Sequence, residues 1–252
     1  MRCRVDNAGL LEGGAVDEYL GTERGNRTAP GPSHRLHQHL LILLRKITEI
    51  VHSNELAPGS TLVDYGCGNK PYEPLFRERF SNYVGADLVG NPHADVVINS
   101  DGTLPIPDGG ADCVLSSQVL EHVRDPALYL NESFRVLRPG GSLILSTHGS
   151  WPYHPDPTDF WRWTIDGLQL QIQLAGYEIV TVKGVFGLES VALQSWQDAT
   201  AGYLPEFIQP LYTRFFQAII GLIERRHPDK LSTDACVYIV LGRKPELAIH
   251  GP

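Results

Sequence analysis

An acid placed directly before a glycine-rich turn is the strongest chemical signal in the chain. Residues 61–69 read TLVDYGCGN, and the apolar run predicts a buried strand that ends at Asp64. Gly66 and Gly68, which flank Cys67, have no Cβ, so this turn can take positive φ and let a ligand approach the backbone. Open α/β sheets bind ligands at the carboxyl ends of their strands, and an acid there suits a cationic ligand. The spacing differs from the Gly-x-Gly-x-x-Gly turn that binds phosphates.

A second acid follows at the end of the next predicted strand, about twenty residues on. Residues 83–88 read YVGADL, which places Asp87 at the strand end with Leu88 beside it. A carboxylate here can accept hydrogen bonds from both vicinal hydroxyls of a ribose. Two acids at neighbouring strand ends, without a phosphate cradle, predict a nucleoside with a positive substituent. S-adenosylmethionine has that chemistry.

Three segments together resemble the class I S-adenosylmethionine-dependent methyltransferases. They are VDYGCG at 63–68, SSQVLEH at 116–122 and RVLRPGG at 135–141, and the resemblance covers roughly residues 62–182 in family order. It implies S-adenosylmethionine as the cofactor and methyl transfer as the activity. It also implies a Rossmann-like doubly wound α/β sheet of seven strands, the last of them antiparallel.

The same resemblance suggests further cofactor contacts. Asp101 corresponds to an acid that accepts a hydrogen bond from the adenine amino group, and Gly102 supplies backbone beside it. Gln118, followed by Val119, is expected near the methionine end of the cofactor. The alternative for Asp101 is an Asx-turn in a surface loop.

A dense run of aromatic, titratable and proline residues follows the fifth predicted strand and is expected to line the acceptor site. It reads HGSWPYHPDPTDFWRWT at 148–164 and resembles a methyltransferase subgroup associated with sugars, lipid-linked glycans and natural products. His148 and His154 are candidate bases for a hydroxyl acceptor. The candidate substrate contacts are Trp151, Tyr153, Asp156, Asp159, Trp161 and Arg162. The structural alternative pairs Asp159 with Arg162, makes Thr164 a helix cap and puts the tryptophans in the core.

Three functions stay open at this point. The first is methyl transfer to a small molecule, most simply to an oxygen of a sugar or natural product. The second is a non-methylating use of S-adenosylmethionine, such as intramolecular alkylation, cyclisation or decarboxylation, and the third is a catalytically silent cofactor-binding protein. No metal is expected, because His34, His37 and His39 occur without an accompanying acid cluster.

Alternating strands and helices predict the elements that must position these residues. Residues 1–33 are rich in Gly, Asn, Arg and Pro and are expected to form a flexible arm or lid, whereas 34–252 read as one domain. The expected strands are 61–64, 83–88, 94–98, 111–116, 142–147, 177–183 and 235–241, and the expected helices are 34–52, 127–137 and 164–175. An insertion at about 184–234 contains a helical apolar pattern over 204–223. It predicts a cap over the substrate end, a homodimerisation hairpin or simple core packing.

Composition sets the remaining limits. A net charge of −8 over 252 residues, with a pI near 5.6, argues against a broad nucleic-acid footprint. The four cysteines show no C-x-x-C spacing and read as buried thiols in a reducing compartment. No membrane span or signal peptide is expected, which makes the cytoplasm the default location.

Overall fold

A seven-stranded mixed sheet forms the centre of the molecule. The computed structural model describes residues 27–57, 59–155, 158–226 and 231–246. The strand order is β3-β2-β1-β4-β5-β7-β6, and β7 runs antiparallel to both of its neighbours. The strands are β1 Thr61–Tyr65, β2 Asn82–Asp87, β3 Val96–Val97, β4 Ala111–Ser117, β5 Leu137–His148, β6 Glu178–Val185 and β7 Val237–Arg243. The predicted doubly wound sheet with an antiparallel last strand is confirmed.

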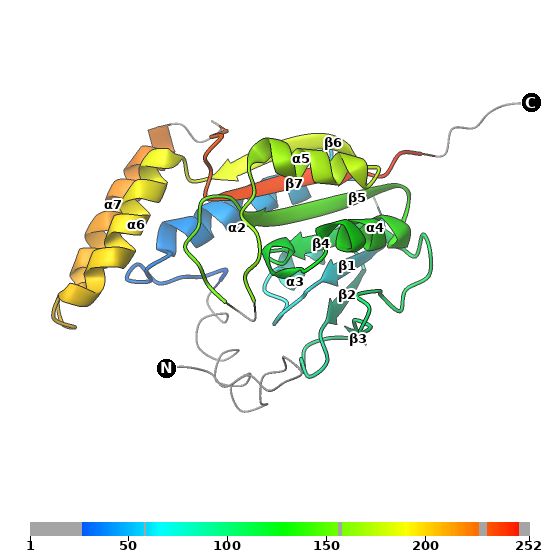
Figure 1. Ribbon diagram of the computed structural model, residues 1–252, viewed down its shortest axis with the longest axis horizontal. Helices are drawn as coiled ribbons and strands as arrows, with labels where there is room; N and C mark the ends of the chain where they lie inside the picture. The colour runs from blue at the N-terminus through cyan, green and yellow to red at the C-terminus, as the bar shows by residue number, and fades with distance from the viewer. Residues whose placement is uncertain (1–26, 58, 156–157, 227–230, 247–252) are drawn as a thin grey trace, which may run out of the picture.

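Helices cover both faces of this sheet (Figure 1). Helix α2 (His37–Val51) and the short α3 (Glu73–Phe76) pack on one face, where Leu43 and Phe76 belong to one buried cluster. Helices α4 (Pro126–Val136) and α5 (Ile165–Leu174) pack on the other, through residues such as Leu130. The two clusters draw on alternate residues of the same strands, as expected for a sheet buried on both sides.

Local signals fix where α4 and α5 begin. The side chain of Asp125 accepts a hydrogen bond from Leu128 N, and Pro126 fills the first turn of α4, where it needs no amide partner. Thr164 caps α5 in the same way by accepting from Gly167 N at 3.1 Å. The capping role in the structural alternative for the 148–164 run is therefore confirmed.

The insertion before β7 is helical, as expected, and forms a hairpin whose second helix coincides with most of the apolar pattern over 204–223. It contains α6 (Leu188–Thr200), the short η3 (Ala201–Tyr203) and α7 (Gln209–Arg226). The sequence pattern missed α6, whose buried positions are the polar residues Ser190, Gln194 and Gln197. In Figure 1 the hairpin stands beside α2, away from the sheet, and Gln38 N donates to Gln217 Oε1 at 2.8 Å.

The described residues bear on the expectations for the cysteines, for membrane spans and for the N-terminal arm. Cys67, Cys113 and Cys236 are buried free thiols, whereas Cys3 lies outside the described residues. Within the described residues, no helix combines the length and apolarity needed to cross a bilayer. Most of the expected 1–33 arm, residues 1–26, also lies outside them.

Candidate functional site

A small, partly open cavity lies against the glycine turn at the carboxyl end of β1. Five of the predicted cofactor residues line it: Asp64, Gly66, Cys67, Gly68 and Gln118. The other lining residues are Arg27, Asn69, Pro71, Tyr72 and Ser117. The structure thus brings the ends of β1 and β4 together around one hollow, as the predicted sheet requires.

The turn needs glycine for two separate reasons. Gly66 has a φ of +89°, and a Cβ built there would lie 2.5 Å from Cγ2 of Val119. Gly68 has a φ of +53°, and its amide donates a hydrogen bond to Oδ2 of Asp87 at 2.7 Å. A side chain at Gly66 would therefore strain the backbone and collide with the segment that follows β4.

Asp64 is a buried acid whose pKa is set by two opposing effects. Its carboxylate is 2% exposed and accepts a 2.5 Å hydrogen bond from the Tyr83 hydroxyl. Burial raises the pKa of Asp64 to about 7, although the Tyr83 hydrogen bond acts in the opposite direction. A carboxyl that ionises near neutral pH in this cavity can respond to the charge of a ligand.

Asp87 lies beside the turn but outside the cavity lining. Its Oδ2 accepts from Gly68 N and from Asn91 Nδ2 at 2.8 Å, and its Oδ1 accepts from Leu88 N at 2.7 Å. Cys67 Sγ also lies 3.9 Å from Oδ2, whereas Oδ1 accepts only from Leu88 N among the described residues and so keeps a lone-pair site for a ligand hydroxyl. The Leu88 side chain is 57% exposed.

Asp101 forms the Asx-turn that the sequence left as the alternative. Its Oδ1 accepts from Thr103 N at 3.0 Å and from Thr103 Oγ1 at 2.7 Å, and these bonds lower the pKa of Asp101. The carbonyl of Gly102 accepts a hydrogen bond from the Tyr65 hydroxyl. An Asx-turn does not prevent the outer carboxylate oxygen from meeting a ligand.

Gln118 has a backbone conformation that is uncommon for a residue with a side chain. Its φ is +59°, and its amide donates to the Ser146 carbonyl at 2.9 Å. The side-chain Nε2 also donates to Ser146 Oγ at 3.1 Å. Such a conformation is a cost of order 1–3 kcal/mol that persists where the surroundings impose it, commonly at functional sites.

Two further cavity residues come from outside the glycine turn and the segment after β4. Arg27 comes from the segment before α2, and no sequence pattern connects it with the glycine turn. Tyr72, for which the sequence allowed packing on the nucleoside or an exposed helix start, is 2% exposed and lies at the N-cap position of α3 without a side-chain capping hydrogen bond. Their placement depends on tertiary packing alone.

The loop after β5 is held by an arginine and aspartate pair. Nη1 and Nη2 of Arg162 contact the two carboxylate oxygens of Asp159 at 2.6 and 2.5 Å, and Arg162 Nε donates to the Trp151 carbonyl at 2.8 Å. The Asp159 side chain is 2% exposed, and it also accepts from His154 N at 2.9 Å. The pairing in the structural alternative is confirmed, and the pair fixes the shape of the loop.

The aromatic residues of this loop have different surroundings. The Trp151 ring stacks on His148 with centroids 4.8 Å apart, and the Trp161 Nε1 donates to the Val123 carbonyl at 2.7 Å. Trp161 and Tyr153 are 39% and 74% exposed, so neither fills the core, whereas Trp151 and Trp163 each pack against a buried cluster as in the structural alternative. Asp156 lies outside the described residues.

His148 and His154 meet a buried glutamate that the sequence analysis did not single out. Nδ1 of His148 lies 2.8 Å from Oε1 of Glu121, and the Thr147 hydroxyl donates to Oε2 of Glu121 at 2.8 Å. Burial raises the pKa of Glu121, but its interactions with His148 and then His122 bring it down to about 2. Burial and the neighbouring His148 lower the pKa of His154 to about 4. The cluster thus holds one carboxylate and a neutral His154 at pH 7.

Comparison with known proteins agrees with this arrangement. Residues 35–182 match the sequence profile of a methyltransferase domain family. A probable S-adenosylmethionine-dependent methyltransferase of Mycolicibacterium smegmatis is 27% identical over 180 residues, which are 64% of this chain and 67% of that protein. An uncharacterized methyltransferase of a Mycobacterium species is 39% identical over 104 residues, 37% of this chain and 41% of that relative. The chain thus spans between two fifths and two thirds of these relatives.

Solved structures share the fold. The phosphoethanolamine N-methyltransferase 2 of Haemonchus contortus in complex with S-adenosyl-L-methionine has a TM-score of 0.53 and 14% identity, and covers 93% of this chain and 58% of its own. The [4+2]-cyclase SpnF has a TM-score of 0.52 and 22% identity, and the match covers 80% of this chain and 81% of SpnF. The chain belongs to the methyltransferase domain family, within the class I S-adenosylmethionine-dependent methyltransferases. Its cofactor is S-adenosylmethionine.

Proposed function

We propose that the protein transfers a methyl group from S-adenosylmethionine to a small-molecule acceptor, at an oxygen of a sugar or natural product. The observation that carries the proposal is the juxtaposition of two sites at one edge of the sheet. The cavity at the glycine turn includes Ser117, and Ser117 Oγ lies 3.1 Å from Ser146 Oγ, two residues before His148. A cofactor in the cavity would therefore adjoin the polar cluster around Glu121.

The residues around the cavity fit the cofactor in charge and shape. S-adenosylmethionine supplies a methyl group that its sulfonium activates. Asp64 would face its cationic methionine end, and Gly66, Cys67 and Gly68 would leave room for it beside the backbone. The same assignment gives Asp87 the ribose hydroxyls.

The remaining cofactor contacts come from the loops that follow β2, β3 and β4. Leu88 would cover one side of the nucleoside, while Asp101 and Gly102 would reach the adenine. Gln118 and Val119 would border the methionine end, where the unusual backbone of Gln118 fixes the segment after β4.

The loop after β5 supplies the acceptor side of the proposal. His148 and His154 would promote loss of the acceptor proton, because both lie in the polar cluster that follows β5. Trp151, Tyr153, Asp156 and Trp161 would contact the acceptor, while Asp159 and Arg162 hold the loop in shape. Alignment of acceptor and methyl group would contribute most of the rate.

Mass spectrometry of the purified protein with S-adenosylmethionine and a panel of hydroxylated sugars and natural products tests the proposal. The expected products are an acceptor heavier by one methylene unit and an equal amount of S-adenosylhomocysteine. Methylthioadenosine would instead indicate a non-methylating use of the cofactor. Bound but unchanged cofactor with every acceptor would indicate a silent binding protein.

His148→Ala and His154→Ala separate the acceptor role from cofactor binding. Each should leave cofactor affinity within a few-fold of the wild type, and at least one should lower turnover on the order of a hundredfold. Turnover that is insensitive to both would remove the histidines from the reaction.

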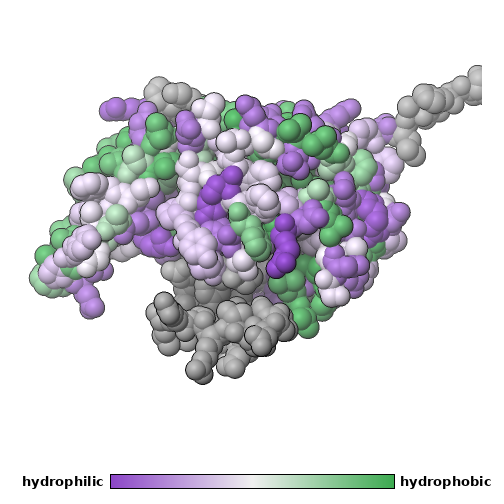
Figure 2. Space-filling view, viewed as in Figure 1, coloured by the Kyte–Doolittle hydropathy of each residue, from purple (hydrophilic) through white to green (hydrophobic). Residues whose placement is uncertain are grey.

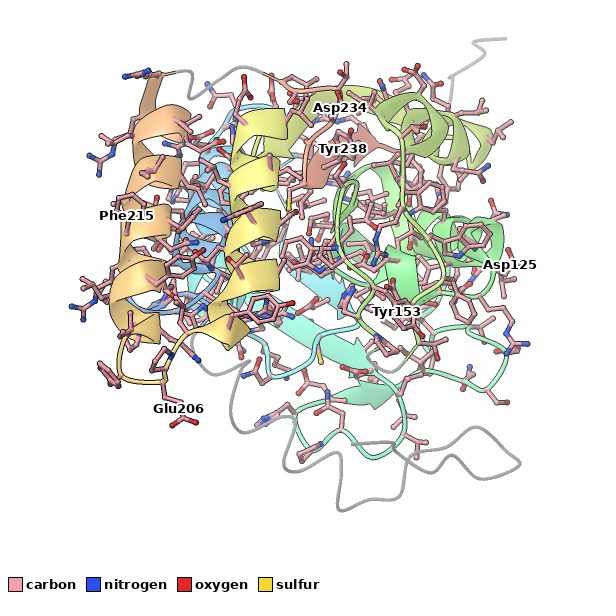
Figure 3. All side chains as sticks on the ribbon, turned by 60° about the vertical axis from the view of Figure 1, so that its left-hand side comes forward. Asp125, Tyr153, Glu206, Phe215, Asp234 and Tyr238 are labelled. Atoms are coloured by element: carbon pink, nitrogen blue, oxygen red, sulfur yellow. The ribbon has the colours of Figure 1, made fainter. Side chains whose placement is uncertain are left out.

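We further propose that the helical hairpin pairs two copies of the chain. Its outer side carries large apolar residues, and Figure 3 shows Phe215 on the side of α7 away from the sheet. Figure 2 shows apolar surface along this part of the molecule. The exposed members are Leu188, Trp196, Tyr203, Phe207, Leu211, Phe215 and Leu222. Residues 211, 215, 218 and 222 have the spacing with which helices pair.

Two smaller expectations complete the proposal. The arm at 1–33 would close over the cofactor, because Arg27 already lines the cavity. The free thiols of Cys67, Cys113 and Cys236 fit a reducing compartment, so we place the reaction in the cytoplasm. No nucleic-acid partner is needed for it.

A further inference from the structure

Two buried polar atoms in the cluster after β5 face each other without forming an aligned hydrogen bond. Oε1 of Glu121 and Nδ1 of His148 are 2.8 Å apart, and neither has a hydrogen-bond partner among the described residues. Both side chains are deeply buried, at 0% and 6% exposure. An unsatisfied buried polar atom costs about 1–3 kcal/mol, more when it is charged, so the arrangement calls for a further partner.

His154 completes a set of potential ligands around these atoms. One ligand atom from each of Glu121, His148 and His154 lies within 4.8 Å of the others. Ligands of a tetrahedral ion with bonds near 2.1 Å are about 3.4 Å apart, so the widest of these separations needs to shorten by up to about 1.4 Å. The His154 side chain is 31% exposed and has room for that movement.

We infer that Glu121, His148 and His154 bind a divalent first-row transition-metal ion such as Zn²⁺ or Mn²⁺. Two imidazoles and one carboxylate suit these ions, whereas Mg²⁺ and Ca²⁺ prefer sites made only of oxygen. The inference revises the expectation that the protein has no metal site, which rested on His34, His37 and His39 alone.

The groups behind the ligands are those that commonly orient metal ligands. Nδ1 of His154 lies 3.3 Å from Oδ2 of Asp159, a buried carboxylate that Arg162 holds in place. Oε2 of Glu121 accepts from the Thr147 hydroxyl at 2.8 Å. Carboxylates behind histidine ligands and hydrogen bonds to ligating carboxylates fix ring orientation and strengthen the site.

His122 offers a fourth ligand atom at the edge of this set. Its Nδ1 lies 2.5 Å from the Thr158 carbonyl, which accepts only if Nδ1 carries the proton. That tautomer leaves Nε2 with its lone pair free, and Nε2 lies 3.9 Å from Oε1 of Glu121. The cluster therefore offers a carboxylate and three imidazoles at the edge of the proposed acceptor site.

The use of the ion rests on the proposed methyl transfer, but its binding does not. An ion at this place would bind the acceptor hydroxyl oxygen and lower its pKa, so that the proton leaves to solvent before the oxygen receives the methyl group. The histidines would then promote proton loss as ligands and not as free bases.

Calorimetric titration of the tag-free full chain tests the site directly. The protein is first treated with a chelator and dialysed, and Zn²⁺, Mn²⁺ or Mg²⁺ is then added without cofactor or acceptor. We expect about one equivalent of Zn²⁺ or Mn²⁺ per chain and no stoichiometric Mg²⁺. Binding of neither transition-metal ion would overturn the inference.

Matched variants locate the ion. His154→Ala should weaken Zn²⁺ binding at least tenfold, and Asp159→Asn should weaken it by about tenfold to a hundredfold. His93→Ala, at an exposed histidine far from the cluster in sequence, is the control and should bind as the wild type does. Glu121→Gln should also lose the ion. If this buried variant does not fold, the Zn²⁺ affinity of His154→Ala, at a partly exposed position, tests the site instead. Unchanged affinity in His154→Ala would place the ion elsewhere and reject the site.

The two proposals fail in different ways. Methyl transfer that survives chelation, with no bound metal, would reject only the ion. A stoichiometric ion that requires His154, in a protein that yields no methylated product, would reject only the proposed reaction.

Discussion

The Tyr83 hydroxyl donates a 2.5 Å hydrogen bond to Oδ2 of Asp64, a carboxyl that is 2% exposed. Tyr83 is the second residue of β2 and Asp64 the fourth of β1, so neighbouring parallel strands create the pair. The bond favours the ionised carboxyl against a larger opposing effect of burial. This balance places the titration of Asp64 near neutral pH, where it can be coupled to the cofactor.

Cofactor affinity should therefore depend on pH. The pKa of Asp64 is about 7 in the native protein, so the carboxyl is mostly protonated at pH 6 and mostly ionised at pH 8. A cationic ligand favours the ionised form, and affinity should rise across this range by at most about tenfold per pH unit. Calorimetry with S-adenosylmethionine at pH 6, 7 and 8 measures it. Asp64→Asn is the control and should bind more weakly with a flatter profile; a wild-type profile equal to it would contradict the assignment.

Stability without cofactor should depend on the same group, in the opposite direction. The ordinary pKa of Asp64 is 3.8 and the native value about 7, so the native state binds more protons between these limits. Its contribution to stability is fully present below about pH 4 and is lost as the pH rises through 7. Asp64→Asn should gain stability relative to the wild type between pH 5 and pH 8, as chemical denaturation at both values would show. A constant difference would mean that Asp64 titrates normally.

Gly66→Ala should weaken cofactor binding while the fold is kept. Gly90 offers a matched control, because both residues have positive φ but only a Cβ at Gly66 would meet another side chain, Val119 at 2.5 Å. Both substitutions should lower the melting temperature through backbone strain. Only Gly66→Ala should lower cofactor affinity, by about tenfold or more. Equal affinities in the two variants would show that the turn does not contact the cofactor.

Arg162→Lys should loosen the loop after β5. The guanidinium makes two hydrogen bonds to Asp159 and one to the Trp151 carbonyl, and a lysine cannot reproduce this planar fork. We expect a loss of about 1–3 kcal/mol in the free energy of unfolding, measured by denaturant titration. Arg124→Lys, at an exposed position, should cost nothing measurable. Equal stability of the two variants would mean that the pair does not hold the loop.

Phe215→Glu should separate the proposed dimer. Phe215 is 59% exposed in the single chain, and a carboxylate there would be buried without a partner if two hairpins pair. Light scattering after gel filtration should give a dimer for the wild type and a monomer for the variant. Val97→Glu, at an exposed apolar residue of β3, is the control and should stay dimeric. A wild-type monomer at all concentrations would reject the pairing.

The sheet and the turn at its centre could be predicted from local sequence patterns alone. The apolar runs that end in Asp64 and Asp87 predict buried strands from their residue types alone. Glycine after the first strand predicts a turn with positive φ, which Gly66 has. The caps at Asp125 and Thr164 are equally local. Helix α6 escaped because its buried side includes glutamines, whose amides bond to the Arg35 carbonyl, a partner about 160 residues away that no periodicity reveals.

Which polar residues meet depends on how the strands and loops pack in three dimensions. Glu121 follows β4 and His148 ends β5, and these parallel neighbours bring both side chains to one edge of the sheet. His154 lies beside them because Asp159, which pairs with Arg162, accepts a hydrogen bond from His154 N and so shapes the loop after β5. Arg27 likewise reaches the cavity from the segment before α2. Contacts of this kind depend on strand order and loop path, so residue spacing along the chain does not encode them.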